Sequence, residues 1–248
     1  MEPSAQRIKS LGREELNAFA AENLRSLLED EALALLDNPH CSAVLCGAVA
    51  QLPRLTAYYS VRLRLIAHRA TPQAHAVKLV HYLHWPDLVR LSVDVTVPAP
   101  VRRAIDKQLL LNVEKLTLGE KLATAKRCSA ALIKVLLFDP EPRVLAALLV
   151  NQRMREDEIL LLAGSSRASA DQLTLISSDR RWSCRLAVRK ALVLNPVTPR
   201  SIAAAQLRFL TASDLRMIHR RPETSVYLRR CIERLRPADF SAEPETLG

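Results

Sequence analysis

An internal repeat constrains the fold of this chain more than any other feature. Residues 55–109 align with residues 182–236 at one constant offset and without a gap. The matched positions include Val61 and Val188, Leu65 and Leu192, Thr71-Pro72 and Thr198-Pro199, Asp87-Leu88 and Asp214-Leu215, and Arg102-Arg103 and Arg229-Arg230. A unit that recurs in this way cannot bury its apolar face alone, so successive units stack and share a core. The repeat therefore predicts a solenoid.

The residues between the repeated segments predict short helices. Asn195 ends an apolar helix, Pro196 cannot continue it, and Thr198-Pro199 opens the next one. Proline has no backbone donor and its φ suits a first helical turn, so we expect Thr198 to be the N-cap. Thr117 and Glu120 form a second start signal, because a threonine followed three residues later by glutamate is the pattern of a capping box.

The composition favours helices over sheets. The chain of 248 residues contains only 5 glycines and 4% aromatic residues, which argues against sandwiches, barrels and glycine-rich phosphate loops. Its apolar residues are mostly Leu, Ala and Val, and 14 prolines separate the helical segments. We therefore predict an all-α fold, a single curved α-solenoid of roughly a dozen short helices.

We expect one continuous solenoid over residues 1–236. It comprises an acidic N-terminal cap over 1–52, equivalent repeat blocks over 53–112 and 182–236, and intervening repeats over 113–181. Residues 237–248 carry acids and prolines without periodicity, which is typical of a frayed tail.

A family resemblance follows from the same residues. Residues 175–207 contain Asp-Arg-Arg-Trp-Ser, Ala-Val-Arg-x-Ala-Leu and Asn-Pro-x-Thr-Pro, and they resemble the units of bacterial leucine-rich repeat variant proteins. The chain from 30 to 236 is similar to HEAT-like α-solenoids. The resemblance implies a right-handed stack of helix pairs, or of α-helices and short 3₁₀-helices. A variant-family protein with an N-terminal iron–sulfur cluster needs a cysteine cluster that is missing here, so we expect no cofactor.

Cysteine usage and hydropathy predict a cytoplasmic protein. The five cysteines are odd in number, and only Cys41 and Cys46 lie close together, so buried thiols are expected rather than disulfides or a metal site. The first 25 residues carry Glu14, Glu15 and Glu22 and no long apolar run, so no signal peptide is expected. No apolar run approaches the roughly 18 residues of a membrane span, so we expect no membrane partner.

Three histidines and an aspartate, His75, His81, His84 and Asp87, are the most metal-like group in the sequence. His81 and His84 share a helix face at i, i+3 spacing. In the second repeat block only the aspartate recurs, as Asp214, so we interpret the histidines as a solvated helix face. The recurring aspartate precedes a leucine and is expected to be an N-cap.

The charge distribution suggests an acidic macromolecular partner. Residues 176–236 hold 14 Lys/Arg against 4 Asp/Glu, whereas residues 1–60 are net acidic. Arginine and aromatic residues that repeat geometry does not require are the best candidates for contact. These partner-binding candidates are Arg180, Arg181, Trp182, Arg185, Arg208, Arg216, Arg220, Arg221, Tyr82 and Trp85.

Three functions remain open from the sequence. The leading hypothesis is a non-enzymatic scaffold whose partner is a protein with an acidic surface. The second is nucleic-acid binding without sequence preference through the basic C-terminal half. The third is a HEAT-like DNA glycosylase, for which Trp85, Asp87 and Trp182 would be candidates. No hydrolase, metalloprotease or nucleotide-binding motif occurs, so we expect no catalytic residues and no metal. The sequence contains no signal for an oligomeric state.

Overall fold

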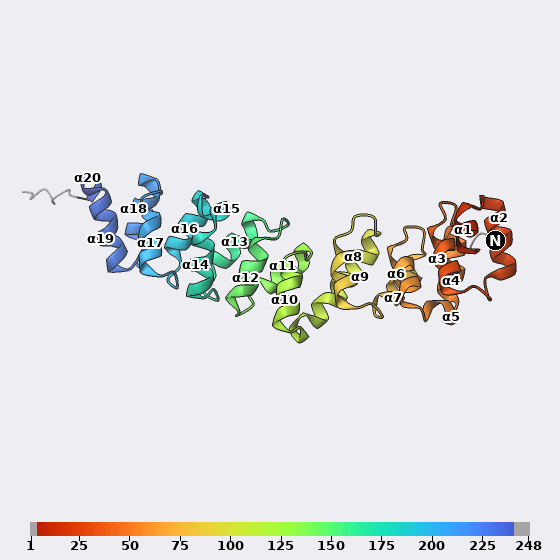
Figure 1. Ribbon diagram of the computed structural model, residues 1–248. Coiled ribbons are helices and arrows are strands. Elements are labelled where there is room, and N and C mark those ends of the chain that lie inside the picture. Colours follow the sequence, from red (N-terminus) through yellow and green to blue (C-terminus); the bar gives the residue numbers. More distant parts are fainter. Residues whose placement is uncertain (1–3, 241–248) are drawn as a thin grey trace, which may run out of the picture. The chain divides into compact units, whose positions relative to one another are not determined.

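The computed structural model describes residues 4–240, and every regular element in that range is helical (Figure 1). The all-α prediction is confirmed. Two compact units are present, one of residues 4–120 with 127–132 and the other of residues 121–126 with 133–240. The first part of the chain contains α1 (Ser4–Ser10), α2 (Arg13–Asn23), α3 (Glu29–Asp37), α4 (Ala43–Gln51), α5 (Pro53–Thr56), α6 (Tyr59–Ala67), α7 (Gln73–Val80), α8 (Trp85–Ser92), α9 (Ala99–Asn112) and the 3₁₀-helix η1 (Val113–Lys115).

The rest of the described chain continues with helices of similar length. They are α10 (Leu118–Ala125), α11 (Ala130–Leu136), α12 (Pro142–Leu149), α13 (Glu156–Ala163), α14 (Ala170–Ser178), α15 (Arg180–Ser183), α16 (Leu186–Leu194), α17 (Arg200–Leu207), α18 (Ala212–Arg220), α19 (Val226–Leu235) and α20 (Pro237–Phe240). The expected frayed tail is helical over α20, and its remainder, 241–248, lies outside the described residues.

The internal repeat extends further in the structure than in the sequence alignment. Each helix of the first unit from α3 to α9 has a counterpart in the second, from α13 to α19, and every pair of helix starts has the offset of the sequence alignment. The equivalence begins at Glu29 and Glu156, so the repeated block starts well before residue 53, the boundary expected from the sequence. Recurring start signals at a constant spacing dictate the same sequence of helices twice.

Helix packing inside each unit is local along the chain. In the first unit α3 contacts α6, α6 contacts α7, α7 contacts α9 and α8 contacts α9. The counterparts α13, α16, α17, α18 and α19 make the same pairings in the second unit. Helices that are consecutive or only a few elements apart in the chain pack against one another within each unit (Figure 1).

The buried residues follow the repeat pattern in both copies. Matched positions are buried in both copies, as expected when one packing arrangement is used twice. The matched core pairs are Val61 and Val188, Leu65 and Leu192, Ala76 and Ala203, Leu83 and Leu210, Leu88 and Leu215, and Ile105 and Ile232.

Buried asparagines connect neighbouring repeats through the backbone. The Nδ2 group of Asn195 donates to the carbonyls of Ala163 and Ser165, at 2.7 and 2.9 Å, while its Oδ1 accepts from Val197 N. Asn38 donates in the same way to the carbonyls of Ile8 and Leu11, and Asn151 donates to that of Ala125. These bonds satisfy carbonyls that a helix end leaves without an intrahelical donor.

A recurring arginine has the same connecting role. Arg54 in α5 donates to the carbonyls of residues 25, 26 and 27. Its counterpart, Arg181 in α15, donates to the carbonyls of Asn151 and Met154. The guanidinium, with several donors in one plane, can bridge adjacent carbonyls that a shorter side chain would not reach.

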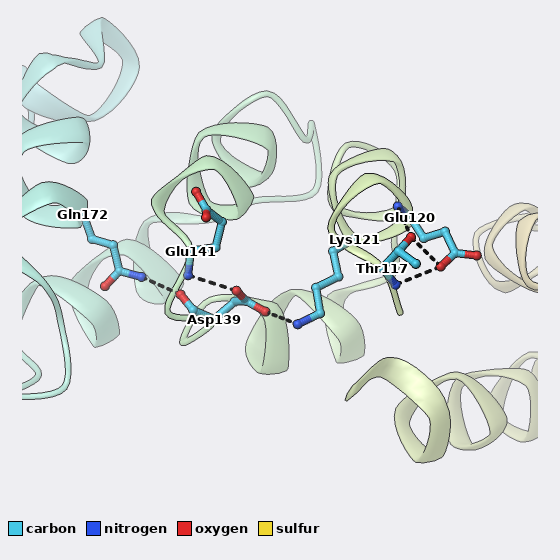
Figure 2. Close-up of polar contacts among 6 residues, drawn as sticks. All are labelled: Thr117, Glu120, Lys121, Asp139, Glu141 and Gln172. Atoms are coloured by element: carbon cyan, nitrogen blue, oxygen red, sulfur yellow. Dashed lines mark hydrogen bonds and ion pairs between the residues drawn. The ribbon is translucent and has the colours of Figure 1, made fainter. Parts of the chain in front are cut away.

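Asp139 forms a further link between neighbouring segments of the second unit (Figure 2). Its carbonyl accepts from Gln172 Nε2 at 2.9 Å, and its carboxylate accepts from Lys121 Nζ at 2.7 Å and from Glu141 N at 3.0 Å. The aspartate therefore orders the turn before α12 and connects it to residues on both sides.

The cap predictions had mixed outcomes. The capping box of Thr117 and Glu120 is confirmed: Thr117 N donates to the Glu120 carboxylate at 2.9 Å, and Thr117 Oγ1 accepts from Glu120 N at 3.4 Å (Figure 2). Thr198 is not an N-cap, because α17 begins after Pro199 and the Thr198 hydroxyl is buried without a hydrogen-bond partner in the described structure.

The recurring aspartates were also expected as N-caps, and that prediction is wrong. The residues that precede α8 and α18 are His84 and Thr211. Asp214 is the third residue of α18, where its backbone N donates to Thr211 Oγ1 and its carboxylate accepts from Thr211 and Lys190. A carboxylate in the first turn still complements the helix dipole.

The Asp214 carboxyl makes the free energy of unfolding depend on pH. The hydrogen bond from Lys190, and after it the bond from Thr211, holds the pKa of the Asp214 carboxyl below its ordinary value. Since the folded pKa is depressed, the contribution is complete above about pH 4 and is lost as pH falls through the folded pKa. We expect Asp214→Asn to lower the unfolding free energy by about 1 kcal/mol at pH 7. Urea titrations followed by circular dichroism should show this difference shrinking below about pH 3; a difference that stayed constant with pH would contradict the assignment.

Candidate functional site

Two cysteines and a histidine converge beside a pocket in the first unit. Cys41 Sγ lies 3.6 Å from Cys46 Sγ, and Cys46 Sγ lies 3.3 Å from His68 Nδ1. The three potential ligand atoms all lie within 4.8 Å of one another. Within residues 4–240, no other trio of histidine, cysteine or carboxylate side chains brings its ligand atoms so close.

Local structure explains how the three side chains meet. Cys41 precedes Ser42, the N-cap of α4, and Cys46 lies one turn into that helix on its buried side. His68 follows the last residue of α6, which packs against α4. An N-cap and a helix end therefore hold these side chains against each other.

The contact between the two thiols shifts their pKa values in opposite directions. The hydrogen bond from the Cys41 thiol is the largest influence on Cys46 and lowers the pKa of Cys46 to about 5, with a smaller contribution from His68. The same bond raises the pKa of Cys41. The contact therefore favours the thiolate form at one sulfur and the protonated form at the other, and a thiolate is the form that acts as a nucleophile or binds metals.

A pocket of about 400 Å³ reaches this group from the surface. Cys41 and His68 line it together with Arg64, Arg69 and the segment 36–39. Arg64 forms an ion pair with Asp37 at 2.5 Å. The ring of His68 is only partly buried, so the pocket gives solvent and small solutes access to the imidazole.

The second repeat copy shows that the fold does not require these residues. The repeat-equivalent positions of Cys41, Cys46 and His68 hold Ala168, Leu173 and Asn195, all of them buried. Ser42 and its counterpart Ser169 nevertheless make the same cap bond in both copies. The helices are the same, whereas one copy carries sulfur and imidazole ligands where the other carries an apolar pair and an amide.

The expectation that all five cysteines are buried holds only in part. Cys41, Cys46 and Cys128 are buried, Cys184 is exposed and Cys231 is half-buried. Sequence reasoning missed the convergence with His68, which lies beyond the end of a different helix from Cys46. The sequence did contain a signal for this group. When the repeat alignment is extended backwards, the two cysteines align with Ala168 and Leu173, and His68 aligns with an asparagine, so all three differ from the residues of the second copy.

The structure changes the role of several partner-binding candidates. Trp182 is 1% exposed, so its ring packs in the interior and is not available to stack on a partner; this corrects the expectation from the sequence. Arg181 and Arg185 lie over that ring, at 4.5 and 5.5 Å from its centroid. Arg181 donates to backbone carbonyls and Arg185 pairs with Glu156 at 2.6 Å, so both have structural partners.

The remaining candidate arginines divide into two groups. Arg216 and Arg221 lie 3.8 and 3.7 Å from the carboxylates of Asp239 and Glu223. Arg180, Arg208 and Arg220 are exposed, and no carboxylate in the described part of the chain pairs with them. The basic residues of this unit are therefore partly occupied by internal bonds.

An arginine over an exposed aromatic ring recurs at equivalent positions. In the first unit Arg62 lies 5.7 Å from the centroid of Tyr82, which is 62% exposed. In the second unit the counterparts are Arg189 and Phe209, 3.6 Å apart, and Phe209 is 44% exposed. Arg208 lies over the same ring at 4.7 Å. Arginine and aromatic residues are both enriched at protein–protein interfaces, and a guanidinium is attracted to the face of an aromatic ring.

The histidine-rich group around α8 does not form a metal-like cluster. His84 stacks on Tyr59 with ring centroids 4.5 Å apart, and His81 bonds to Gln108. Asp87 accepts from the Tyr59 hydroxyl and from Arg90. Trp85 is half-buried at the start of the same helix. These side chains stabilise the junction of α6 and α8, and Asp87 has two partners.

Comparisons with known proteins give no relative. Within residues 4–240 no helix combines the length and apolar character needed to cross a bilayer. No family model matches the chain, and neither the curated proteins nor the solved structures contain a match.

Proposed function

We propose that each unit is an α-solenoid and that the protein is a non-enzymatic scaffold for a protein partner with an acidic surface. The observation that carries the proposal is the recurrence of an arginine-covered, exposed aromatic ring at equivalent repeat positions, Arg62 with Tyr82 and Arg189 with Phe209. The solenoid assignment rests on the recurring helix starts from α3 to α9 and from α13 to α19, and on packing limited to near neighbours.

The chemistry of these two surfaces suits an acidic and partly apolar partner. An exposed ring offers apolar area at low entropic cost, and the guanidinium above it can pair with a carboxylate. Arginine and tyrosine are enriched among the residues that contribute most to protein–protein binding. Val226 and Tyr227, at the start of α19, add further exposed apolar side chains in the second unit.

Internal bonding favours a protein partner over nucleic acid. Phosphate binding requires many arginines that are free to replace counterions. Here Arg185, Arg216 and Arg221 face carboxylates, and Arg181 and Arg229 donate to carbonyls. Nucleic-acid binding remains the second candidate because Arg180, Arg208 and Arg220 have no carboxylate partner among the described residues.

A capture experiment tests the proposal. The full chain is immobilised and exposed to lysate of its native cells, with and without nuclease, and retained proteins are identified by mass spectrometry. We expect an acidic protein that is retained in both samples and is lost when Tyr82→Ala and Phe209→Ala are combined. Truncating the rings removes apolar contact and leaves the net charge unchanged. The lost binding would therefore not result from weaker electrostatic attraction of the whole protein for its partner.

The matched control is Leu111→Ala, which truncates another exposed apolar side chain, 66% exposed, that belongs to neither arginine–ring pair. This variant should retain the partner as the unaltered chain does. Retention that disappears on nuclease treatment would replace the proposal with nucleic-acid binding. That alternative also predicts that anisotropy of a labelled DNA duplex falls steeply from about 50 to 200 mM salt.

A further inference from the structure

We propose that Cys41, Cys46 and His68 form a binding site for a thiophilic divalent metal ion, with Zn²⁺ as the best fit. Two sulfurs and an imidazole nitrogen are ligands that zinc prefers. Three protein ligands leave one coordination position for a molecule from the adjoining pocket. This inference is independent of the scaffold function.

The distances fit a tetrahedral ion. With metal–sulfur bonds of about 2.3 Å and a metal–nitrogen bond of about 2.0 Å, tetrahedral angles place two sulfurs about 3.8 Å apart and sulfur and nitrogen about 3.5 Å apart. The structure has 3.6 Å between Cys41 Sγ and Cys46 Sγ and 3.3 Å between Cys46 Sγ and His68 Nδ1. The remaining edge, between Cys41 and His68, is within 4.8 Å, so a small side-chain rotation closes the triangle.

Burial and charge support the same assignment. Cys46 is fully buried and Cys41 is 7% exposed. Two thiolates in so buried an environment need a positive charge beside them. A divalent cation bound to two thiolates and a neutral imidazole gives a site without net charge. The repeat-equivalent trio of Ala168, Leu173 and Asn195 shows that stability alone does not demand these ligands.

Besides the contacts among the three ligand atoms, which metal bonds would replace, one hydrogen bond must be exchanged when the metal binds. His68 Nδ1 accepts from Ala70 N at 3.2 Å, and a metal bound to Nδ1 takes that lone pair. Ala70 lines the pocket and is only partly buried, so its N–H can turn to solvent. A single neutral hydrogen bond contributes less than a metal–imidazole bond, and the exchange therefore favours binding.

The fourth coordination position faces the pocket. Cys41 and His68 line the pocket, whereas Cys46 does not. A fourth ligand would therefore reach an ion held among the three ligand atoms from the pocket, past Arg69 and segment 36–39. Arg69 adds a positive group to the wall, which favours a small anion as an exchangeable ligand.

The test titrates the full, reduced chain with Co²⁺ and then with Zn²⁺. The background carries Cys184→Ala and Cys231→Ala, which remove the accessible thiols. We expect one equivalent of Co²⁺ to give sulfur-to-metal charge transfer and the intense visible bands of a four-coordinate ion, and Zn²⁺ to displace it. Adding azide should shift the visible bands, because the fourth position is open. Bound Zn²⁺ should also raise the unfolding midpoint.

Repeat-matched variants provide the decisive comparison. Cys41→Ala, Cys46→Leu and His68→Asn each install the residue that the second copy carries at the equivalent position, so folding is retained. Each should weaken Zn²⁺ affinity by about 100-fold or more and abolish the four-coordinate Co²⁺ spectrum. Circular dichroism confirms that the variants fold. The proposed metal site would be wrong if the folded, reduced chain bound no metal, or if the variants bound it with unchanged affinity. A Co²⁺ spectrum that azide does not change would show that the fourth coordination position is not open.

Discussion

Replacing Trp182 with alanine is expected to lower the free energy of unfolding by about 3–5 kcal/mol, the largest effect that we expect from a single substitution in this chain. The indole is 1% exposed and lies in α15, a short helix that contacts α14 and α16. Truncation would leave a cavity where three helices meet and would remove the surface on which Arg181 and Arg185 rest. Neighbouring side chains cannot fill such a volume.

The repeat supplies a graded control for this prediction. Leu55 is the counterpart of Trp182 and is also 1% exposed, so leucine is compatible with this position in the other copy. The indole Nε1 has no hydrogen-bond partner in the described structure, so Trp182→Leu loses volume without losing a bond. We expect it to cost less than half as much as Trp182→Ala. Urea unfolding should be followed by far-ultraviolet circular dichroism, because both variants lose a fluorophore. Equal unfolding midpoints for the unaltered chain and the alanine variant would refute the packing role.

The second large effect is expected at Asn195. Its side chain is 5% exposed and makes three hydrogen bonds, two from Nδ2 to Ala163 O and Ser165 O and one from Val197 N to Oδ1. Asn195→Ala leaves two carbonyls and one N–H without these partners. Since an unsatisfied buried polar group costs about 1–3 kcal/mol, we expect a loss of about 2–4 kcal/mol after partial relaxation, measured by urea unfolding.

Two further variants separate the donors from the acceptor. Asn195→Asp keeps the acceptor for Val197 but places an oxygen opposite two carbonyl oxygens, so its loss should equal or exceed that of alanine. Asn112→Ala removes a half-buried amide that donates to Gln108 O and accepts from the nearby, exposed Lys115 Nζ, and it should change stability by about 0.5 kcal/mol. If Asn195→Asp proved as stable as the unaltered chain, the two donor bonds would not connect the repeats.

The sequence alone determined where most helices lie. Proline restarts and capping residues act within a few residues, and so the repeat in the sequence becomes a repeat of helix starts from α3 to α9 and from α13 to α19. The periodic apolar residues indicated the core for the same reason: Val61, Leu65 and Ile105 are buried, as are their counterparts.

Only the tertiary structure decided which side chains meet. Whether Trp182 faces solvent or the interior depends on the packing of α14 and α16, and the pairing of Asp214 with Lys190 joins residues of different helices. Cys46 and His68 are brought together by the packing of α4 against α6, which no local pattern specifies. Local patterns determine helices because their interactions span a single helical turn, whereas a metal site or a partner surface arises from contacts between segments far apart in the chain.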